Sequence, residues 1–291
     1  MSMEFTRILK RYMVGEDVRT VKDRLVELGY LYKSTHNRFG DDTYRAVKAF
    51  QSANNLEPVD GIVGFITWQT LFGDPKPVPS VEVPDWIAEP ARTEISQALA
   101  GASAKRKEIC LLALQYCVDR NANPKLLKGF YIRGANEFDK DLTPHIMTEA
   151  RLNSYFRRTA YEPYYDGGRK EMMLRQAKVA NYTIVGADCS GMIVGLWRKC
   201  KVVANDFDAA ADSLYSHYCV KRKAADIQPG DLAHRSGHIG LCVSKNLIVE
   251  AAGGAYGIQL TKRTDRRCLN FVSGKVTKLG KWQNFGDPKA Y

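Results

Sequence analysis

The chain has 291 residues, 45% of them hydrophobic and 26% charged, which is typical of a folded globular protein and not of a disordered one. No apolar run approaches the roughly 18 to 20 residues that cross a bilayer, so membrane insertion is not expected. The seven cysteines form no C-x-x-C pair, which argues against a disulfide framework and a zinc ribbon.

The net charge of +11 is unevenly distributed along the chain. Residues 1–73 carry +1, residues 74–90 carry −3 and residues 91–291 carry +13. A surface of this kind attracts polyanions. The basic residues are dispersed and match no helix-turn-helix, RNA-recognition or zinc-finger signature, so nucleic acid is not an expected partner.

Three helices are predicted in the first 73 residues. An apolar stripe at Val18, Val21, Leu25 and Leu28 predicts a helix over 16–28, closed by Gly29. Further helices are predicted over 41–53 and 66–72. The segments FGDDTYRAV and VGFITWQTL, which precede or open them, share an apolar residue, then Gly, then Thr three positions on. This repeat indicates a short internal duplication.

These segments resemble a known module. The order GEDVRTVKDRLVELGY, FGDDTYRAVKAFQ, NNL and DGIVGFITWQTL is similar to the small three-helix peptidoglycan-binding module often attached to cell-wall hydrolases. The resemblance covers about residues 12–73. It implies bacterial peptidoglycan as a partner.

A proline-rich segment follows, DPKPVPSVEVPDWIAEP, with five prolines in residues 74–90. Proline fixes φ and favours extended neighbours, so the segment is predicted to be a semi-rigid linker. The expected organisation is therefore a unit at 1–73, a linker at 74–90 and a second unit at 91–291.

The second unit is predicted to be α+β. Residues 92–119 have mostly helical periodicity, with Cys110 and Cys117 on one face as core thiols. The stretch EMMLRQAKVA is helical, a further helix begins at Cys189, and the strands HIGLCV and NLIVEA follow, separated by a short turn. Helices that precede strands in this way indicate an α+β fold.

The stretch GADCSGMIVGLWRK places Cys189 in the first turn of an apolar helix that Asp188 can cap. Unpaired N–H groups and the helix dipole favour an anion there, so a lowered thiol pKa is expected. The Cys189 N–H is also placed to stabilise an oxyanion. These features favour a nucleophile over a core cysteine.

A base and an orienting residue are predicted downstream. His238 begins one strand and Glu250 lies twelve residues later, near the end of the next. If an odd-length loop joins the strands, residues of equal parity share a face and Glu250 lies beside His238. Cysteine, histidine and carboxylate then fill the roles of nucleophile, base and orienter.

The segments DCSGMIVGLW, IQPGDLAH and HIGLCVSKNLIVEA resemble the NlpC-type cysteine peptidases, a papain-like α+β family that acts on cell-wall peptides. The resemblance spans about residues 182–260. It implies Cys189 as nucleophile, His238 as general base and Glu250 as third polar residue, where the family commonly has histidine. It also implies that Asp188 and Ser190 contact the amino side of the substrate, although Asp188 is equally well explained as a helix cap.

A tyrosine that the family usually carries before the cysteine is not obvious here. Either Tyr182 takes its place or the segment GFYIRGA (129–135) supplies it across an insertion.

The remaining histidines are assigned no catalytic role. His234 lies four residues before His238 and is expected to be a solvated loop residue, while His36, His145 and His217 have no partner pattern. His217 and Cys219 have no second pair at zinc spacing, so neither a metal nor another cofactor is predicted.

The expected function is hydrolysis of the γ-D-glutamyl to diamino acid bond of the stem peptide through a cysteine thioester. The alternatives are cleavage of the N-acetylmuramoyl to L-alanine amide, acyl transfer, and a catalytically inactive wall-binding or phage structural protein. Anionic wall polymers are further expected partners for the basic unit. The N-terminus has no signal-peptide pattern, so the expected location is the host cytoplasm before release to the wall, as for a phage endolysin, or a non-classical route for a bacterial lysin.

Overall fold

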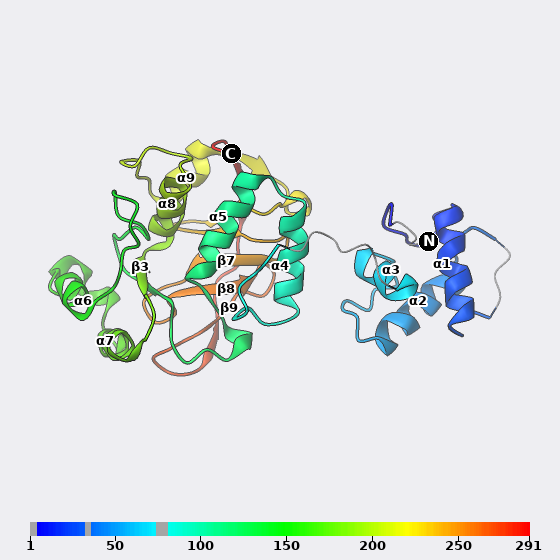
Figure 1. The fold of residues 1–291 in the computed structure, drawn as a ribbon, viewed down its shortest axis with the longest axis horizontal. Helices are drawn as coiled ribbons and strands as arrows, with labels where there is room; N and C mark the ends of the chain where they lie inside the picture. The colour runs from blue at the N-terminus through cyan, green and yellow to red at the C-terminus, as the bar shows by residue number, and fades with distance from the viewer. Residues whose placement is uncertain (1–4, 33–35, 74–80) are drawn as a thin grey trace. The chain divides into compact units, whose positions relative to one another are not determined.

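The computed structural model describes residues 5–32, 36–73 and 81–291 (Figure 1). The chain divides into two compact units between residues 79 and 80. Each unit has its own hydrophobic core. No helix in the described part of the chain is long and apolar enough to cross a membrane.

The first unit contains three helices around one apolar core. They are α1 (Glu16–Glu27), α2 (Asp41–Ala53) and α3 (Phe65–Phe72). The predicted duplication is confirmed, because Gly40 and Gly64 cap α2 and α3 with nearly the same backbone (φ −87°, ψ −174° and φ −83°, ψ −175°). Thr43 and Thr67, three residues further on, are both buried.

The predicted linker is shorter than its sequence suggests. Its residues 74–80 lie outside the described residues, but 81–90 pack into the second unit. Val83 and Ile87 are buried there, and Trp86 donates from Nε1 to the Leu114 carbonyl at 3.3 Å. Apolar side chains between the prolines are buried at the nearest core, which proline spacing alone does not reveal.

The second unit has the predicted mixed α+β composition. Its helices are α4 (Ala91–Ala100), α5 (Ala104–Gln115), α6 (Glu149–Phe156), α7 (Arg169–Val179), α8 (Cys189–Lys199) and α9 (Ala211–Tyr218), with 3-10 turns at Arg120–Ala122, Thr159–Tyr164 and Ala224–Asp226. The predicted helical stretch at 92–119 is two helices with a break at 101–103. Cys110 and Cys117 are fully buried free thiols, as predicted.

Among the described residues, seven strands form the main sheet in the order β1-β8-β7-β6-β5-β11-β4. The pairing of β1 with β8 is parallel and the others are antiparallel. The strands are β1 (Val118–Asp119), β4 (Cys219–Arg222), β5 (Leu232–Arg235), β6 (His238–Cys242), β7 (Leu247–Ala251), β8 (Ile258–Lys262) and β11 (Asn284–Pro288).

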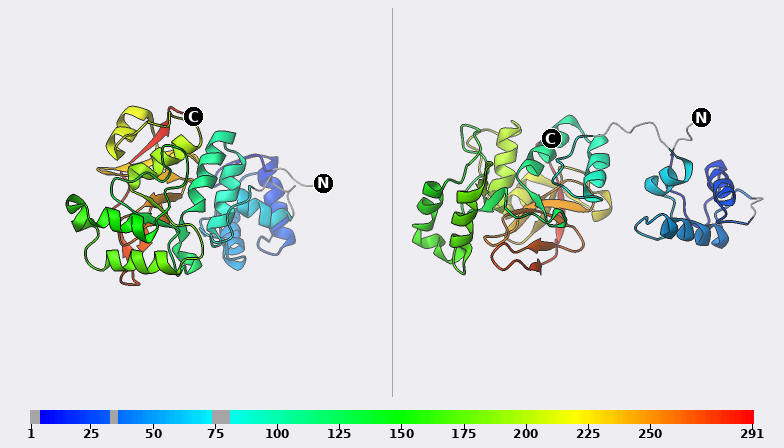
Figure 2. Two further views of the ribbon diagram at one scale, coloured as in Figure 1. Left: turned by 60° about the vertical axis from the view of Figure 1, so that its left-hand side comes forward. Right: turned by 60° about the horizontal axis from the view of Figure 1, so that its bottom comes forward.

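Two smaller pairs complete the strands described. β2 (Gly129–Tyr131) and β3 (Val185–Ala187) are parallel, and β9 (Arg267–Leu269) and β10 (Val276–Lys278) form an antiparallel hairpin, seen at the lower edge of the right-hand view in Figure 2.

The two faces of the sheet pack differently. Helices α5 and α8 lie side by side against one face (Figure 1), where Ile239 and Leu241 of β6 join their core. On the other face Cys242 packs with Trp282 and Phe285. Helices α6 and α7 pack on each other and form a separate lobe with its own small core. This arrangement places the first turn of α8 at one end of the sheet.

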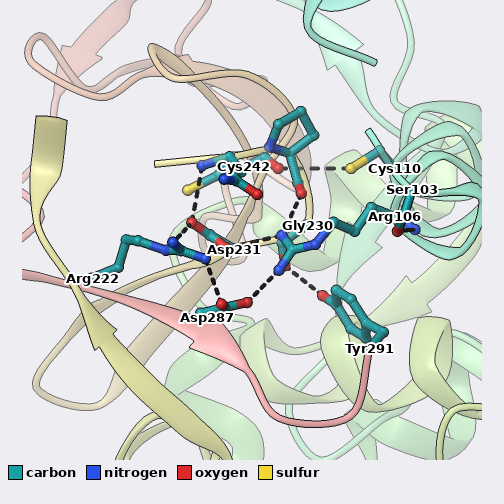
Figure 3. A network of polar contacts seen from close by, with 11 residues as sticks. Ser103, Arg106, Cys110, Arg222, Gly230, Asp231, Cys242, Asp287 and Tyr291 are labelled. Carbon is teal, nitrogen blue, oxygen red and sulfur yellow. Dashed lines mark hydrogen bonds and ion pairs between the residues drawn. The ribbon is translucent and has the colours of Figure 1, made fainter. Parts of the chain in front are cut away.

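A buried polar network ties helix α5 to the sheet (Figure 3). Asp231, in the predicted PGDL motif, is fully buried and receives Arg106 Nη1 at 2.9 Å and the Gln228 N–H at 2.9 Å. Arg222 Nε lies 3.1 Å from its other oxygen, and both arginines also pair with Asp287. The network joins α5, β4, β5 and β11, so it fixes the helix that supports α8.

Candidate active site

Cys189 is the first residue of α8, immediately after β3. Because β2 and β3 are parallel, their carboxyl ends meet at the same edge, and the 132–135 loop lies against the start of α8. Asp188 caps the helix: its Oδ1 accepts the Gly191 N–H at 2.8 Å and its Oδ2 accepts the Gly134 N–H at 2.9 Å. As the first helical residue, Cys189 has an N–H with no acceptor inside the helix.

Gly191 allows this close approach. A Cβ at this position would lie 1.9 Å from the Ala135 carbonyl oxygen, which only glycine avoids. The Glu137 N–H also donates to the Gly191 carbonyl at 3.1 Å. The glycine two residues after the cysteine is therefore needed to pack the loop against the helix.

The Cys189 thiol is 5% exposed and donates to the Gly237 carbonyl at 3.8 Å, the residue just before His238. Burial raises its pKa to about 11, and the charge of Asp188 adds to this rise. The backbone N–H groups of Ile239 and Ser190 lower the pKa by less. The expectation of a lowered thiol pKa is therefore wrong for this resting structure, because the helix start is buried and its cap is anionic. The resting cysteine is therefore a thiol.

His238 and Glu250 meet as their parity predicts. The β6–β7 register pairs Leu241 with Val249, and the Val243 N–H donates to Leu247 across a turn formed by residues 244–246. This odd-length turn puts His238 and Glu250 on one face, and His238 Nε2 lies 2.8 Å from Glu250 Oε2. A hydrogen bond there leaves Nδ1 as the nitrogen that can accept a proton.

Glu250 is fully buried but compensated. Arg266 Nε donates to Oε1 at 2.8 Å, and Thr261 Oγ1 donates to Oε1 at 2.7 Å. Burial alone would raise the pKa of this carboxyl, but hydrogen bonds from Arg266 and His238 lower it to about 2. The carboxylate is therefore ionised at neutral pH. Its stabilising effect is present above the ordinary glutamate pKa of about 4.3 and is lost only as the pH falls toward 2.

Sequence reasoning missed Arg266 and Trp282. Arg266 lies in the polar run TKRTDRR, which is typical of a solvated loop, yet its side chain is only 4% exposed. Trp282 stacks on the His238 ring with a centroid distance of 5.3 Å. No periodicity marks either residue, because both reach the site from loops.

An open hollow of about 400 Å³ lies beside Cys189. Asp188 and Ser190, the predicted substrate contacts, both line it. The other lining residues are Gly134, Asn136, Asp208, Ala209 and Ala210. Two carboxylates thus face this hollow, although the unit as a whole is strongly basic.

Tyr182 lies elsewhere. It precedes β3, at the opposite end of that strand from Cys189, and its hydroxyl donates to the Leu127 carbonyl at 3.2 Å. Tyr131 of the segment 129–135 is the tyrosine near Cys189: it pairs with Ala187, and burial together with the charges of Cys189 and Asp188 raises its pKa. Of the two alternatives considered for the tyrosine, this geometry favours the segment 129–135.

His234 is also not the solvated loop residue expected. It lies in β5, is 8% exposed, stacks on Tyr215 and places Nε2 2.7 Å from Asp212 Oδ1. The same oxygen accepts the Gly237 N–H at 2.9 Å, so this pair holds the turn to which Cys189 bonds. The prediction failed because residue 234 lies within strand β5 and not in a loop.

His145, to which no role was assigned, belongs to a polar cluster in the segment between β2 and α6. Its Nδ1 lies 2.5 Å from Asp139 Oδ1 and its Nε2 lies 3.0 Å from the Tyr155 hydroxyl. These contacts hold the loop that contains Asp139 and His145 to helix α6.

One family model matches part of the first unit. Residues 14–71 match the family described as a putative peptidoglycan binding domain. The N-terminal unit is a peptidoglycan-binding domain. The spore cortex-lytic enzyme of Bacillus subtilis (strain 168) is 38% identical over 66 residues, which are 23% of this chain and 22% of that protein. The match thus spans about a fifth of the length of this relative. No solved structure matches the present chain.

The peptidoglycan-binding domain has its own surface hollow of about 490 Å³. It lies at the start of α2 and is lined by Val14, Lys22, His36, Asn37, Arg38, Gly40 and Asp42. The Lys22 ammonium group donates to the carbonyls of His36 and Arg38 at 2.7 and 3.1 Å, so it forms part of the wall of the hollow.

Glu137, in the loop that packs on α8, is a buried acid that sequence patterns did not mark. It is fully buried, and neither of its carboxyl oxygens has a hydrogen-bond partner among the described residues. Burial raises its pKa well above the ordinary value. The folded state therefore keeps a proton that the unfolded state releases above about pH 4.3, so this residue lowers stability as the pH rises.

Replacement of Glu137 by Met is expected to remove this penalty. The variant should gain stability over the wild type as the pH rises from about 5 to about 8, by up to roughly 1.4 kcal/mol per pH unit. Urea unfolding at the two pH values measures the difference, with the exposed Glu149→Gln as control. An equal stability difference at both pH values would contradict the assignment.

Proposed function

We propose that the second unit is a papain-like cysteine hydrolase of the NlpC type that cleaves the γ-D-glutamyl to diamino acid bond of the peptidoglycan stem peptide. The observation that carries the proposal is the junction at the start of α8. There a capped cysteine bonds to the turn before His238, whose imidazole is oriented by a buried carboxylate. The peptidoglycan-binding domain on the same chain supports the substrate class.

The raised pKa of the Cys189 thiol favours general-base catalysis. His238 Nδ1 accepts the thiol proton as sulfur attacks the carbonyl carbon, and the Cys189 N–H stabilises the oxyanion. Collapse of the tetrahedral intermediate breaks the C–N bond, and His238 returns the proton to the leaving amine. Water, deprotonated by His238, then hydrolyses the thioester and releases the carboxylic acid.

The hollow beside Cys189 supports recognition of a substrate amine. Asp188 uses both oxygens in capping and loop contacts. Among the described residues, exposed Asp208 accepts only the Ala209 N–H, at 3.0 Å through Oδ1. Asp208 therefore has an oxygen available for an ammonium group. A stem peptide with a free amino end carries such a group.

Asp208→Asn is expected to raise KM about threefold to fivefold for a stem peptide with a free amino terminus, with little change in kcat, because an exposed ion pair contributes up to about 1 kcal/mol. The same peptide with an acetylated amino terminus should show no such difference between variant and wild type. Kinetics with both peptides measure the effect, and exposed Asp206→Asn is the matched control. An equal loss on both peptides would exclude amine recognition by Asp208.

The two-unit arrangement supports action at an anionic wall. The binding domain would raise the local substrate concentration, and the basic second unit would be attracted to anionic wall polymers. We further propose that the protein reaches the wall after release from the cytoplasm of the host, as an endolysin does.

The bond that is cut is identified by mass spectrometry of soluble fragments from purified peptidoglycan, digested in parallel with wild type and Cys189→Ala. Fragments that end at D-glutamate, absent with the variant, would support the endopeptidase. Intact stem peptides freed from glycan would replace it with an amidase, and ligated peptides would indicate acyl transfer. No release from several wall types would leave wall binding as the function.

A further inference from the structure

We propose that Arg266 is a positioning residue for the catalytic base, acting through Glu250 and Trp282. Its positive charge offsets the negative charge of the Glu250 carboxylate. Glu250 can then orient the His238 ring without raising the proton affinity of the His238–Glu250 pair. This inference rests on the proposed function and assigns a role to a residue that contacts neither the nucleophile nor the hollow.

The contacts between Arg266 and Glu250 are extensive. Arg266 Nε lies 2.8 and 3.0 Å from the two Glu250 oxygens, and Nη2 donates to Oε2, the oxygen that also faces His238. Nη1 donates to the Gly280 carbonyl at 2.9 Å, which anchors the guanidinium from the far side. Both side chains are nearly inaccessible, so water screens this charge pair little.

Trp282 connects the same arginine to the histidine ring. The Arg266 Cζ lies 4.7 Å from the centroid of the Trp282 ring, which stacks on His238 at an interplanar angle of 17°. Gly240 leaves room for the indole, because a Cβ there would lie 3.1 Å from Trp282 Cη2. The imidazole is therefore held by Glu250 at one nitrogen and by Trp282 at one face.

Charged groups from several elements surround His238, and Arg266 is the one that offsets the charge of Glu250. Glu250 reaches it from β7 and Arg266 from the loop after β8. Arg235 is its direct partner on β5, Cys189 lies at the start of α8, and Asp212 of α9 holds the preceding Gly237. A lone buried carboxylate beside an imidazole favours the protonated pair. Arg266 supplies the opposite charge instead, so the pair can release its proton and Nδ1 can accept one from the thiol.

The test follows the His238 ring by NMR in the full chain with labelled histidine, in a Cys189→Ala background. Arg266→Gln is expected to shift the midpoint of the His238–Glu250 titration upward by about one pH unit, a tenfold gain in proton affinity. Arg266→Lys keeps the charge and should restore most of the original midpoint. Arg267→Gln is the matched control, since Arg267 is the exposed neighbour and pairs with Asp265.

An unchanged midpoint in folded Arg266→Gln, or a shift equal to that of Arg267→Gln, would overturn the proposal. If Arg266→Gln does not fold, Thr261→Val removes the hydroxyl bonds to Glu250 and to the Ile248 carbonyl and should give a smaller upward shift. No shift, or a downward one, would likewise overturn the proposal. In the Cys189-containing enzyme the acid limb of kcat/KM should move with the midpoint. Because the NMR titration needs no turnover, the proposed role of Arg266 can be disproved while the proposed hydrolase activity stands. In the same way, the activity can be disproved while the role of Arg266 stands.

Discussion

Cys189→Ala is expected to lower wall hydrolysis by at least about 10⁴-fold. Loss of the nucleophile removes the covalent route altogether, and what remains is the contribution of binding and of the oxyanion donors. Binding to peptidoglycan should be unchanged, because the binding domain is a separate unit with its own core.

The measurement is the rate of dye release from labelled peptidoglycan, together with sedimentation of the protein with the wall. Cys200→Ala is the matched control: Cys200 caps the other end of α8, is 1% exposed and should leave the rate within a few-fold of wild type. Residual activity of Cys189→Ala near that of Cys200→Ala would exclude Cys189 as nucleophile. Loss of sedimentation would instead indicate that the substitution perturbs more than the thiol.

Asp231→Asn is expected to destabilise the second unit by about 3 to 5 kcal/mol. The carboxylate is fully buried, and its replacement leaves the guanidinium groups of Arg106 and Arg222 with Asp287 as their remaining acidic partner (Figure 3). Removal of one partner from a buried charge network leaves uncompensated charge, which costs far more than the network contributes over an apolar replacement. The melting temperature of this unit should fall by roughly 10 °C.

Calorimetry of the full chain measures this effect, because the two units have separate cores. The transition of the binding domain should not move. Asp226→Asn, an exposed aspartate five residues earlier, is the control and should change stability by less than about 0.5 kcal/mol. A melting temperature within the range of that control would mean that Asp231 is not needed to hold α5 on the sheet.

Features that depend on one element or on neighbouring elements could be predicted from the sequence. Helical periodicity located the three helices of the first unit, and the Gly-x-x-Thr repeat located two equivalent caps. Asp188 before an apolar run marked the start of α8. Strand parity across an odd-length turn placed Glu250 beside His238, because side chains in a hairpin alternate strictly between two faces.

Features that depend on distant segments or on burial could not be predicted from the sequence. The choice of Tyr131 over Tyr182 follows from a parallel pairing between strands more than fifty residues apart. Arg266 and Trp282 reach the base from loops whose polar sequences carry no periodicity. The burial of His234, and of Val83 and Ile87 in the core of the second unit, depends on which surfaces each segment covers.

The pKa of the Cys189 thiol shows most directly why local sequence cannot predict the properties that depend on packing. Its place at a helix start is local and favours the thiolate, but the solvation of the thiol is a property of everything packed around it. Burial and the Asp188 charge outweigh the helix start, so the resting group is a thiol. Local sequence therefore located the candidate nucleophile, whereas the packing of distant segments set its protonation and selected the residues that surround its base.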